Sequence, residues 1–456
     1  MLDQLHIVGI VYAAVEVDNK LYLGGQFTSV LGQARSNFAV INLSDGSLDP
    51  FDAVFNSRIL SIADIGNGRI ILSGVFSSIQ EVHLGPTSRA TTGIVVLDCA
   101  SGLFSFFNIT APVYPDPGNP YAGSFVNLAP RFGIVKYNPT TDTIYASLSA
   151  GGVSVPGGIQ DQFGVISIDA STLEIIGSLN EGFQTVLFRT YGVGVPGYPW
   201  NTPTPLTIPG DGIAGMDIDI SGQTIYVSPL KSSFDNSVNI GVNFITRYDI
   251  SDRTQFASSS WEVTSSHAAR IFFRTNKIFL AAIPSPQGWG PTSVQGTTVS
   301  GGAVISSADN PTSGSVSPFN PGFSGPTGAS VGPPAFERTV WDMEEYDGKL
   351  FVYGKFGSLI TATENPSGEC VLALDETTYA RLNSPANTSH WAKLGYQGPQ
   401  FDVYTYGLAQ TYFRHDNKIH VFGRFPQISG AVRSDPTQLI LNQDADLPQN
   451  KFLVAL

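Results

Sequence analysis

Short apolar runs that end at a glycine recur along the whole chain. The clearest is Leu21–Val30, in which Leu-Tyr-Leu leads into Gly24 and Gly25. Its close and weaker variants start at Ile70, Leu350, Ile419, Ile144, Ile225 and Ile278. The mean spacing of these starts is about 66 residues, somewhat more than one four-stranded sheet requires. The pattern therefore predicts a repeat of one small β-unit.

Each unit has the same internal order of strand, tight turn, glycine-rich strand and third strand. The turns between the first two strands are rich in residues that tolerate positive φ: Asp18–Lys20, Gly66–Gly68, Ser221–Gln223, Asp347–Lys349 and Asp416–Lys418. The predicted third strands are Phe38–Leu43, Gly93–Leu97, Phe163–Ile168, Phe244–Tyr248, Val304–Ser306, Val371–Leu374 and Leu439–Leu441. A fourth strand is the least distinct, which is typical of an exposed outer edge.

Several strands are apolar at consecutive positions, so both of their faces are expected to be buried. Ile70–Leu72, Ile94–Leu97 and Leu350–Val352 show this pattern. A strand of a β-sandwich would alternate, because one of its faces meets water. In a propeller each sheet is covered by a neighbour on both sides. The sequence therefore predicts an all-β fold: a single seven-bladed β-propeller of four-stranded antiparallel blades.

We expect one domain over residues 1–456. The predicted blades cover approximately residues 9–55, 56–110, 131–182, 212–262, 267–310, 338–383 and 405–456. The apolar segment Lys451–Leu456 has no downstream hairpin partner. We expect this segment, or Leu5–Val8, to complete the last blade, so that N- and C-terminal strands share the closing sheet.

Connectivity predicts that the two faces of the ring differ. Turns from strand one to two and from three to four lie on one face, and the remaining connections lie on the other. The tight turns belong to the first set. The predicted long insertions belong to the second: Ala111–Pro130, Gln184–Asp211, Ile283–Gly301, Asp309–Glu337 and Ser384–Phe401. Insertions gathered on one face often mark the interacting face, although they can also simply cover the rim.

Aromatic side chains on these long loops are the candidate interaction residues. They are Tyr191, Tyr198, Trp200, Trp289, Trp391 and Tyr396. Beside proline and glycine, exposed aromatic rings suit contact with sugars or proteins. The alternative is that they fold back and fill small cores within the loops.

Composition and charge restrict the classes of partner. With 24 basic and 37 acidic residues, the formal charge is −13, and no basic cluster stands out. An acidic surface repels phosphate backbones, so we expect no nucleic-acid partner. No apolar run reaches about 18 residues, so we expect no membrane insertion. We expect Cys99 and Cys370 to be free and buried, since their units would not adjoin in a ring of seven.

The sequence contains no recognisable catalytic, cofactor or metal motif. Six histidines are present, but none has HxH or HExxH spacing, and the Gly-Gly pairs lack the lysine and helix of a phosphate loop. Asp217 and Asp219 alternate on a predicted strand, so they share one side of it and suit either cation binding or a solvated wall. Asn442–Asp446 resembles half of a calcium loop but lacks its glycine and distal glutamate. We therefore expect no enzymatic activity, no cofactor and no metal.

The first unit resembles the delta-sixty repeat propellers of bacterial surface proteins and phage structural proteins. The resemblance rests on Gly24–Thr28, Arg35–Asn42 and Asp45–Phe51. It is good in the first unit and partial in the second, sixth and seventh, whereas only the strand spacing survives in the third to fifth. It implies a propeller scaffold without shared catalytic residues, and such a fold likeness does not give a function.

The composition of the chain and its first residues suggest a class of function. The chain is rich in Gly, Ser, Thr, Asn and Phe, as extracellular proteins are, yet its first residues lack the basic region of a secretory signal. A protein released by lysis combines both properties. We expect a structural or interaction protein of a phage virion, such as a tail, baseplate, fibre or head-decoration subunit. Its partners would be other proteins of the assembly or a host-surface glycan. The alternative is a secreted or cell-surface bacterial adhesin or lectin-like propeller.

Overall fold

The structure is a computed structural model of the chain. It describes residues 5–107, 131–150, 153–155, 158–160, 164–178, 213–218, 223–229, 242–249, 255–264, 269–274, 277–282, 293–299, 302–306, 316–319, 339–346, 348–357, 368–380, 408–415, 418–424, 427–428, 431–432 and 438–442. These residues form antiparallel sheets, several of them four-stranded. The prediction of an all-β fold is therefore confirmed.

The first sheets follow the predicted order of strands, and each is named after its first strand. The β1 sheet contains β1 (Ile7–Val17), β2 (Lys20–Val30), β3 (Gln33–Ala34) and β4 (Phe38–Asn42). The β6 sheet contains β6 (Ile59–Asp64), β7 (Arg69–Gly74), β10 (Ile94–Asp98) and β11 (Leu103–Phe106). The β12 sheet contains β12 (Arg131–Asn138), β13 (Thr143–Ala150), β16 (Gly164–Asp169) and β17 (Ile175–Ser178).

The remaining large sheets repeat this order. The β18 sheet contains β18 (Ile213–Ile218), β19 (Thr224–Pro229), β20 (Val242–Asp249) and β21 (Gln255–Thr264). The β22 sheet contains β22 (Ala269–Arg274), β23 (Lys277–Ala282), β26 (Gly302–Ile305) and β27 (Val316–Pro318). Two sheets have three described strands each: β28 (Thr339–Tyr346), β29 (Lys349–Gly357) and β30 (Gly368–Asp375), then β31 (Leu408–His415), β32 (Lys418–Arg424) and β35 (Gln438–Asn442).

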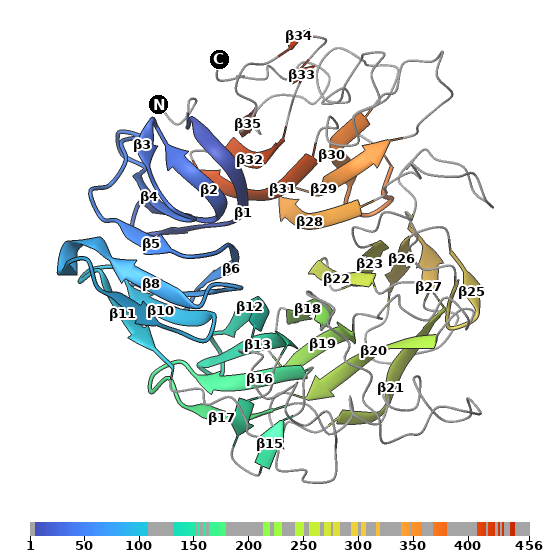
Figure 1. Cartoon of the computed structure of the whole chain (residues 1–456). Helices are drawn as coiled ribbons and strands as arrows, with labels where there is room; N and C mark the ends of the chain where they lie inside the picture. Colours follow the sequence, from blue (N-terminus) through green and yellow to red (C-terminus); the bar gives the residue numbers. More distant parts are fainter. Residues whose placement is uncertain are drawn as a thin grey trace, which may run out of the picture.

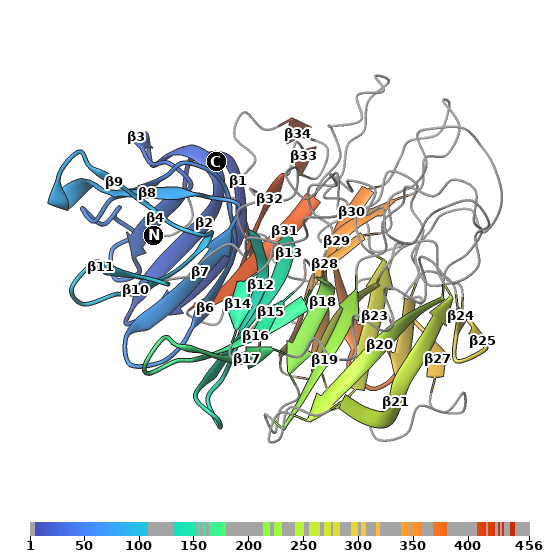
Figure 2. The same ribbon diagram turned by 60° about the horizontal axis from the view of Figure 1, so that its bottom comes forward.

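Small elements leave the large sheets between their second and third strands. They are β8 (Ser78–Glu81), the 3-10 turn η2 (Val82–Leu84), β9 (Ser88–Ala90), β14 (Val153–Val155), β15 (Gly158–Gln160), β24 (Ser293–Val294), β25 (Thr297–Thr298), β33 (Gln427–Ile428) and β34 (Ala431–Val432). In addition, β5 (Ala53–Phe55) pairs with β8 and joins the first two large sheets. In Figure 2, β9, β33 and β34 lie on the same upper side of the molecule.

The large sheets stand around a common axis with their first strands innermost (Figure 1). Successive first strands touch: β1 lies against β6, β6 against β12, β12 against β18, β18 against β22, β22 against β28, and β28 against β31. The circle is completed because β31 also lies against β1. The chain therefore forms a closed ring of sheets.

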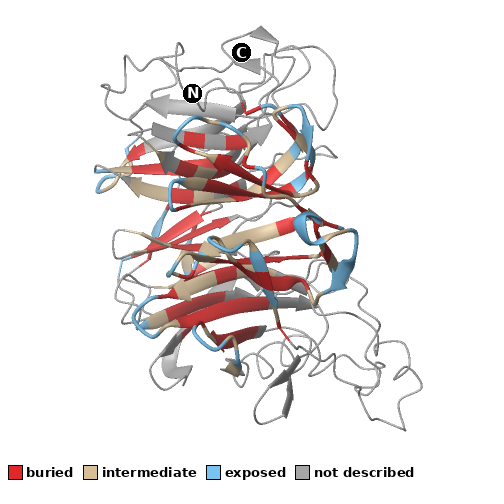
Figure 3. Cartoon of the chain, turned by 90° about the vertical axis from the view of Figure 1, so that its left-hand side faces the viewer, coloured by how far each residue is buried: buried red, intermediate tan, exposed pale blue. Residues whose placement is uncertain are grey.

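Both faces of a sheet are buried, as the consecutive apolar residues predicted. In β7, Ile70 and Leu72 pack toward the β1 sheet, whereas Ile71 packs with Val135 and Ile144 of the β12 sheet. Burial follows the strands all around the side of the ring in Figure 3, and exposed residues concentrate at the turns. Successive side chains of a strand point to opposite faces, so each apolar residue packs against the sheet on its own side.

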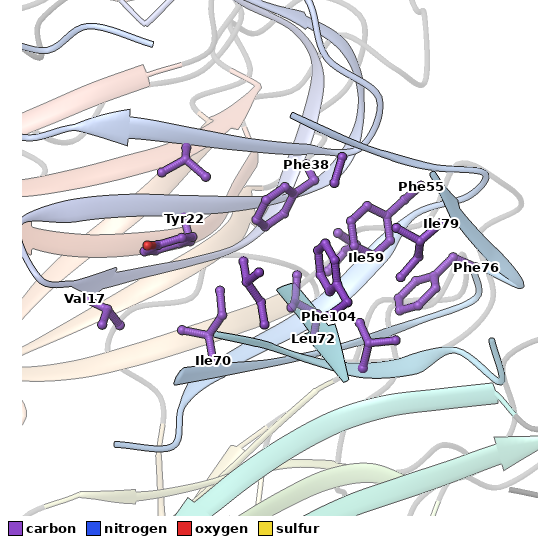
Figure 4. Packing of buried hydrophobic residues seen from close by; sticks show 14 residues of the cluster. Val17, Tyr22, Phe38, Phe55, Ile59, Ile70, Leu72, Phe76, Ile79 and Phe104 are labelled. Atoms are coloured by element: carbon purple, nitrogen blue, oxygen red, sulfur yellow. The ribbon is translucent and has the colours of Figure 1, made fainter. Parts of the chain in front are cut away.

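Aromatic rings fill the space between the β1 and β6 sheets (Figure 4). Phe38 lies 5.5 Å from Phe55 and 6.5 Å from Phe104 between ring centroids, and Phe55 contacts Phe76 edge-on at 4.8 Å. These distances and tilts suit the quadrupoles of the rings. The small β5–β8–β9 sheet supplies Phe55 and Ile79 to this cluster, so it covers the junction of the two large sheets.

The glycine corner of the repeat has a steric cause. A Cβ at Gly25 would lie 2.0 Å from the carbonyl oxygen of Ile10 in β1, and one at Gly24 would lie 2.6 Å from the Ile59 side chain of the next sheet. Gly74, at the same place in β7, would bring its Cβ to 2.3 Å from the carbonyl oxygen of Arg58. A side chain at these positions would separate two strands or two sheets.

The tight turns have the backbone that their residues predict. Asp18 and Asn19 have φ of 51° and 60°, and Gly66, Asn67 and Gly68 all have positive φ. Asn and Gly adopt this region at the lowest cost. The turns bring β1 against β2 and β6 against β7 with the predicted pairing.

Two expectations need correction. Ile7 and Val8 pair with Val30 and Ser29 of β2, so this segment belongs to the first sheet and does not complete the last one. Lys451–Leu456 lies outside the described residues. The predicted insertion Asp309–Glu337 contains β27, the fourth strand of its sheet. The sequence did not predict this strand, because Val-Ser-Pro is too short to show a strand pattern.

The contact between the β31 and β1 sheets, called the closing joint below, is made by side chains. Phe413 of β31 and Phe422 of β32 pack in one cluster with Val11, Leu21 and Leu23. Within the described residues, closure therefore comes from two sheets packing face to face. The insertion Ile283–Gly301 provides a different connection, since its β24 pairs with β21 and extends the preceding sheet.

Candidate functional site

Polar side chains on the first strands meet their counterparts on the next strand of the ring. We call this set the inner belt; it contains Glu16, Lys136, Asp217, Arg274, Asp342, Glu344, Tyr412 and His415. These residues come from β1, β12, β18, β22, β28 and β31. Ionisable residues contact one another across several sheets in the inner belt, so it is the first place to look for chemistry.

Asp217 lies between two cations from two different sheets. Its Oδ1 is 3.0 Å from Lys136 Nζ, and its Oδ2 accepts hydrogen bonds of 2.9 Å from Arg274 Nη1 and from the Phe273 N–H. Burial alone would raise the pKa of this carboxyl, but Lys136 and Arg274 outweigh burial and hold the pKa below its usual value. Asp217 is therefore ionised and fully engaged at neutral pH.

Arg274 continues the contact into the next sheet. Its Nε and Nη2 donate to the Met343 carbonyl oxygen of β28 at 3.0 and 2.8 Å, and its Nη2 is 3.9 Å from Asp342 Oδ1. Burial disfavours the charged guanidinium, yet Asp217 and the other nearby acids raise its pKa. One planar side chain thus connects β18, β22 and β28, which a lysine could not do with a single nitrogen.

The belt continues to the closing joint. Tyr412 Oη donates to Glu344 Oε2 at 2.5 Å, and its ring stacks on Tyr353 with centroids 4.7 Å apart. Burial, followed by the charges of Asp342 and Glu344, raises the pKa of Tyr412 well above its usual value. At the closing joint itself, His415 Nδ1 is 3.3 Å from Glu16 Oε2.

The junctions of the first three sheets are connected differently. The Val135 N–H donates to Ser61 Oγ at 3.3 Å, and Ser73 Oγ donates to the Gly133 carbonyl at 2.9 Å. Arg69 donates to the Ala170 carbonyl at 2.8 Å, and Asn37 donates to that of Phe55 at 2.8 Å. These four contacts use no carboxylate, in contrast to those of the inner belt.

The chemistry available to the inner belt is limited by its own contacts. General acid–base catalysis works best when the pKa of the group lies near the operating pH. The pKa of Asp217 is displaced downward and that of Tyr412 upward, so both are displaced away from neutrality. Among the described residues, there is no group of three or more His, Cys, Asp or Glu side chains placed to hold a metal ion.

The structure places only some of the candidate residues that the sequence predicted. The candidate aromatics Tyr191, Tyr198, Trp200, Trp289, Trp391 and Tyr396 all lie outside the described residues. Asp219 and residues 443–446 also lie outside them, while Asn442 ends β35. Asp217 is a buried ion-pair residue, not a solvated wall. Cys99 is free as expected but only partly buried. His420 is buried and stacks on Phe413 at 4.5 Å.

Sequence reasoning missed Arg274, Lys136, Glu344 and Tyr412. They lie on the first strands β22, β12, β28 and β31, and a polar residue on a first strand was the available signal. The partners of Arg274 and Tyr412 lie 57 to 69 residues away in the chain, so no local pattern pairs them.

The motif of the first unit serves the fold. Asn37 Oδ1 accepts from the Phe27 N–H at 3.2 Å, and its Nδ2 reaches the Phe55 carbonyl. The buried Arg35 donates to the Asp49 carbonyl at 3.2 Å and is 3.7 Å from Asp52 Oδ2. Lys20 Nζ is 2.9 Å from Asp49 Oδ2. These contacts fix the loop that leads from the first large sheet to the second.

No model of a protein family matches the chain, and no curated protein matches it. Among solved structures it is similar to the computationally designed Ika8 protein, at 9% identity over 96% of this chain and 99% of that one, with a TM-score of 0.40. It is also similar to the Cps50 (Swd1) β-propeller domain of Myceliophteria thermophila, at 11% identity over 59% and 69% of the two chains, with a TM-score of 0.27.

A third similar structure is a puromycin-hydrolyzing peptidase of Mycobacterium tuberculosis, at 12% identity and a TM-score of 0.43. This chain is covered over 99% of its length and spans 53% of the peptidase. The structural neighbours are β-propellers, and at these identities the likeness concerns the fold alone. No specific family is identified, so the chain is an all-β protein with propeller-like neighbours. Among the described residues, no helix is long and apolar enough to cross a bilayer.

Proposed function

We propose that the ring is a seven-bladed β-propeller of the delta-sixty type. The support for seven blades is the succession of first strands β1, β6, β12, β18, β22, β28 and β31, each beside the next, with β31 beside β1. The support for the delta-sixty type is the first unit, where Gly25, Arg35 and Asn37 of the motif each have a steric or hydrogen-bonding role in closing the unit.

We infer that this propeller is a non-enzymatic structural or interaction protein, and that it is a component of a phage virion. The observation that carries the proposal is the engagement of the inner belt. Its charged side chains hold neighbouring sheets together, with Asp217 between Lys136 and Arg274. A centre used for cohesion leaves recognition to the surface. The connections between second and third strands, which carry β8–β9, β14–β15, β24–β25 and β33–β34, are the elaborated part of that surface.

The extracellular-type composition fits a subunit of a tail, baseplate, fibre or head decoration. Such subunits bind other structural proteins, or attach to a host surface, through extended loops on a rigid scaffold. The net charge of −13 fits a protein that works among proteins and not on nucleic acid.

Mass spectrometry of purified virions tests this assignment. The chain should be present at a fixed stoichiometry after density-gradient purification, and gold-labelled antibodies against it should decorate one part of the particle. Its absence from intact particles, with presence in the lysate, would contradict the virion proposal.

The second candidate is a bacterial adhesin or lectin-like propeller at the cell surface. The loop positions that the sequence predicts for Trp289 and Trp391 favour it, because sugars stack on indole rings that loops present. Binding to a glycan array that is lost in Trp289→Ala or Trp391→Ala and kept in Leu103→Ala, an exposed position on β11, would favour this candidate. Hydrolase activity on any array glycan that is lost in Asp217→Asn would overturn the non-enzymatic assignment.

A further inference from the structure

The two parts of the ring are held together by different chemistry. From β12 through β18, β22, β28 and β31 to β1, the contacts between successive first strands include Asp217, Asp342, Glu344 or Glu16. Between the first three sheets, the contacts use hydroxyl, amide and carbonyl groups together with two large apolar clusters. At the first strands, only the first kind of contact changes when carboxylates take up protons; the carboxylates near the β1 and β6 sheets lie farther out, with Asp52 beside Arg35 and Glu81 accepting from the Phe104 N–H.

Among these carboxylates, Asp217 is the one whose contacts should change most on protonation. Its side chain is 8% exposed, and Arg274 is 19% exposed. Removing the charge of one partner in such a buried group leaves the remaining charges without compensation, which is strongly destabilising. Protonated Asp217 would leave Lys136 and Arg274 facing each other across two strand junctions.

We propose that the ring opens in acid from one side: protonation of Asp217 releases the junctions of β18 with β12 and β22, while the β1 and β6 sheets stay closed on each other. This inference concerns the scaffold and does not depend on the proposed function.

The groups around Asp217 determine the direction of the effect. Lys136 faces it from β12 and Arg274 faces it from β22, while Tyr226 is its pairing partner on β19. Arg274 is in turn surrounded by Asp342, Glu344 and Tyr412. Protonation of Asp217 therefore leaves two cations without the carboxylate they share, which acts against the closed arrangement.

The pH range follows from the pKa of Asp217. The folded-state pKa is lowered relative to the unfolded value of about 3.9, so the stabilisation is complete above about pH 4. It is lost as the pH falls through the lower folded-state value. Because Asp217 contacts Lys136 of β12 and Arg274 of β22, opening starts at the β18 junctions.

Hydrogen exchange, corrected for the intrinsic rate at each pH, tests the proposal on the full-length protein. In wild type, peptides covering β18 and β22 should exchange about tenfold faster at pH 2.5 than at pH 7, with β7 and β10 unchanged. Asp217→Asn should show the same local gain already at pH 7. The matched control is Asp64→Asn on β6, an exposed aspartate whose Oδ1 accepts from the Gly66 N–H, and it should leave exchange unchanged.

A milder variant keeps the test decisive if Asp217→Asn does not fold. Lys136→Met removes the cation that lowers the pKa of Asp217 most, so a given degree of opening should be reached at a higher pH than in wild type. Equal gains in every sheet at pH 2.5, or an unchanged onset in Lys136→Met, would overturn the proposal.

Discussion

Arg274 of β22 donates two hydrogen bonds, of 3.0 and 2.8 Å, to the carbonyl oxygen of Met343 in β28 while its third nitrogen contacts Asp217 in β18. One side chain thus holds three neighbouring first strands. This geometry requires the planar, forked guanidinium, because a single ammonium cannot reach acceptors on both sides.

Arg274 should therefore be sensitive even to a conservative change. Arg274→Lys should lower the free energy of unfolding by about 2 kcal/mol, and Arg274→Ala by about 3–5 kcal/mol, because the buried Asp217 loses a partner. Guanidinium titration followed by tryptophan fluorescence measures both. Arg58→Lys, at an exposed position, is the control and should change stability by less than about 0.5 kcal/mol. A small effect of Arg274→Ala would mean that the contact does not connect the sheets.

The glycine corner gives a second prediction. Gly25→Ala should cost more than about 3 kcal/mol, because its Cβ would lie 2.0 Å from the backbone oxygen of Ile10 and the paired strands would have to separate. Gly32→Ala meets no atom within 4 Å and has a φ of +74°, so it should cost only about 1–2 kcal/mol. Thermal unfolding of both variants compares the two costs. Equal costs would contradict the close approach as the reason for glycine at position 25, since Gly25 does not have a positive φ.

The closing joint gives a third prediction. Phe413 is buried against residues of the β1 sheet, so Phe413→Ala should destabilise the protein by about 3–5 kcal/mol. Hydrogen exchange should increase in β1 and β2, which lie far from position 413 in the sequence. Leu103→Ala, at a side chain that is 48% exposed, should cost less than about 1 kcal/mol and leave β1 unchanged. Faster exchange confined to β31 and β32 would contradict direct packing between the two sheets.

The aspartate that ends the third strand β10 gives a fourth prediction. Asp98 Oδ1 accepts from the Ser101 N–H at 2.7 Å and from the Ser101 hydroxyl at 2.8 Å, which lowers the pKa of Asp98. Ser101→Ala removes only the hydroxyl, so the pKa should rise part of the way to its usual value, as measured by carbon-13 carboxyl NMR. Because the folded-state pKa is lowered, the turn contributes stability above about pH 4 and loses it in acid. A pKa of Asp98 that does not move would contradict the hydroxyl contact.

Much of the fold could be predicted from local pattern. The consecutive apolar residues Ile70–Leu72 predicted a strand covered on both faces, and the recurring glycine at position 25 marked the place where the structure has a close approach between strands. Each of these features depends on residues within about ten positions of one another, so it can be recognised in a single sequence. The turns at Asp18–Asn19 and Gly66–Gly68 belong to the same class.

The inner belt could not be predicted in this way. Asp217 stood out only through its spacing from Asp219, whereas its real partners come from other sheets, with Arg274 57 residues away. The pairing of β24 with β21 has the same origin, since two residues of a loop add to a sheet that was already complete. Contacts between sheets depend on how the ring closes, and that is not written in any single repeat.

Chemical cross-linking across the closing joint tests the closed ring most directly. In a protein with Cys99→Ser and Cys370→Ser, the pair Glu16→Cys and His415→Cys lies 399 residues apart in sequence, at positions whose native side chains are 3.3 Å apart. A short bismaleimide should join the two cysteines within one molecule, whereas Glu16→Cys with Gln223→Cys on the opposite side of the ring should give no such product. A ring that closes predicts the first link as the main monomeric product; links only between molecules, or none, would contradict it.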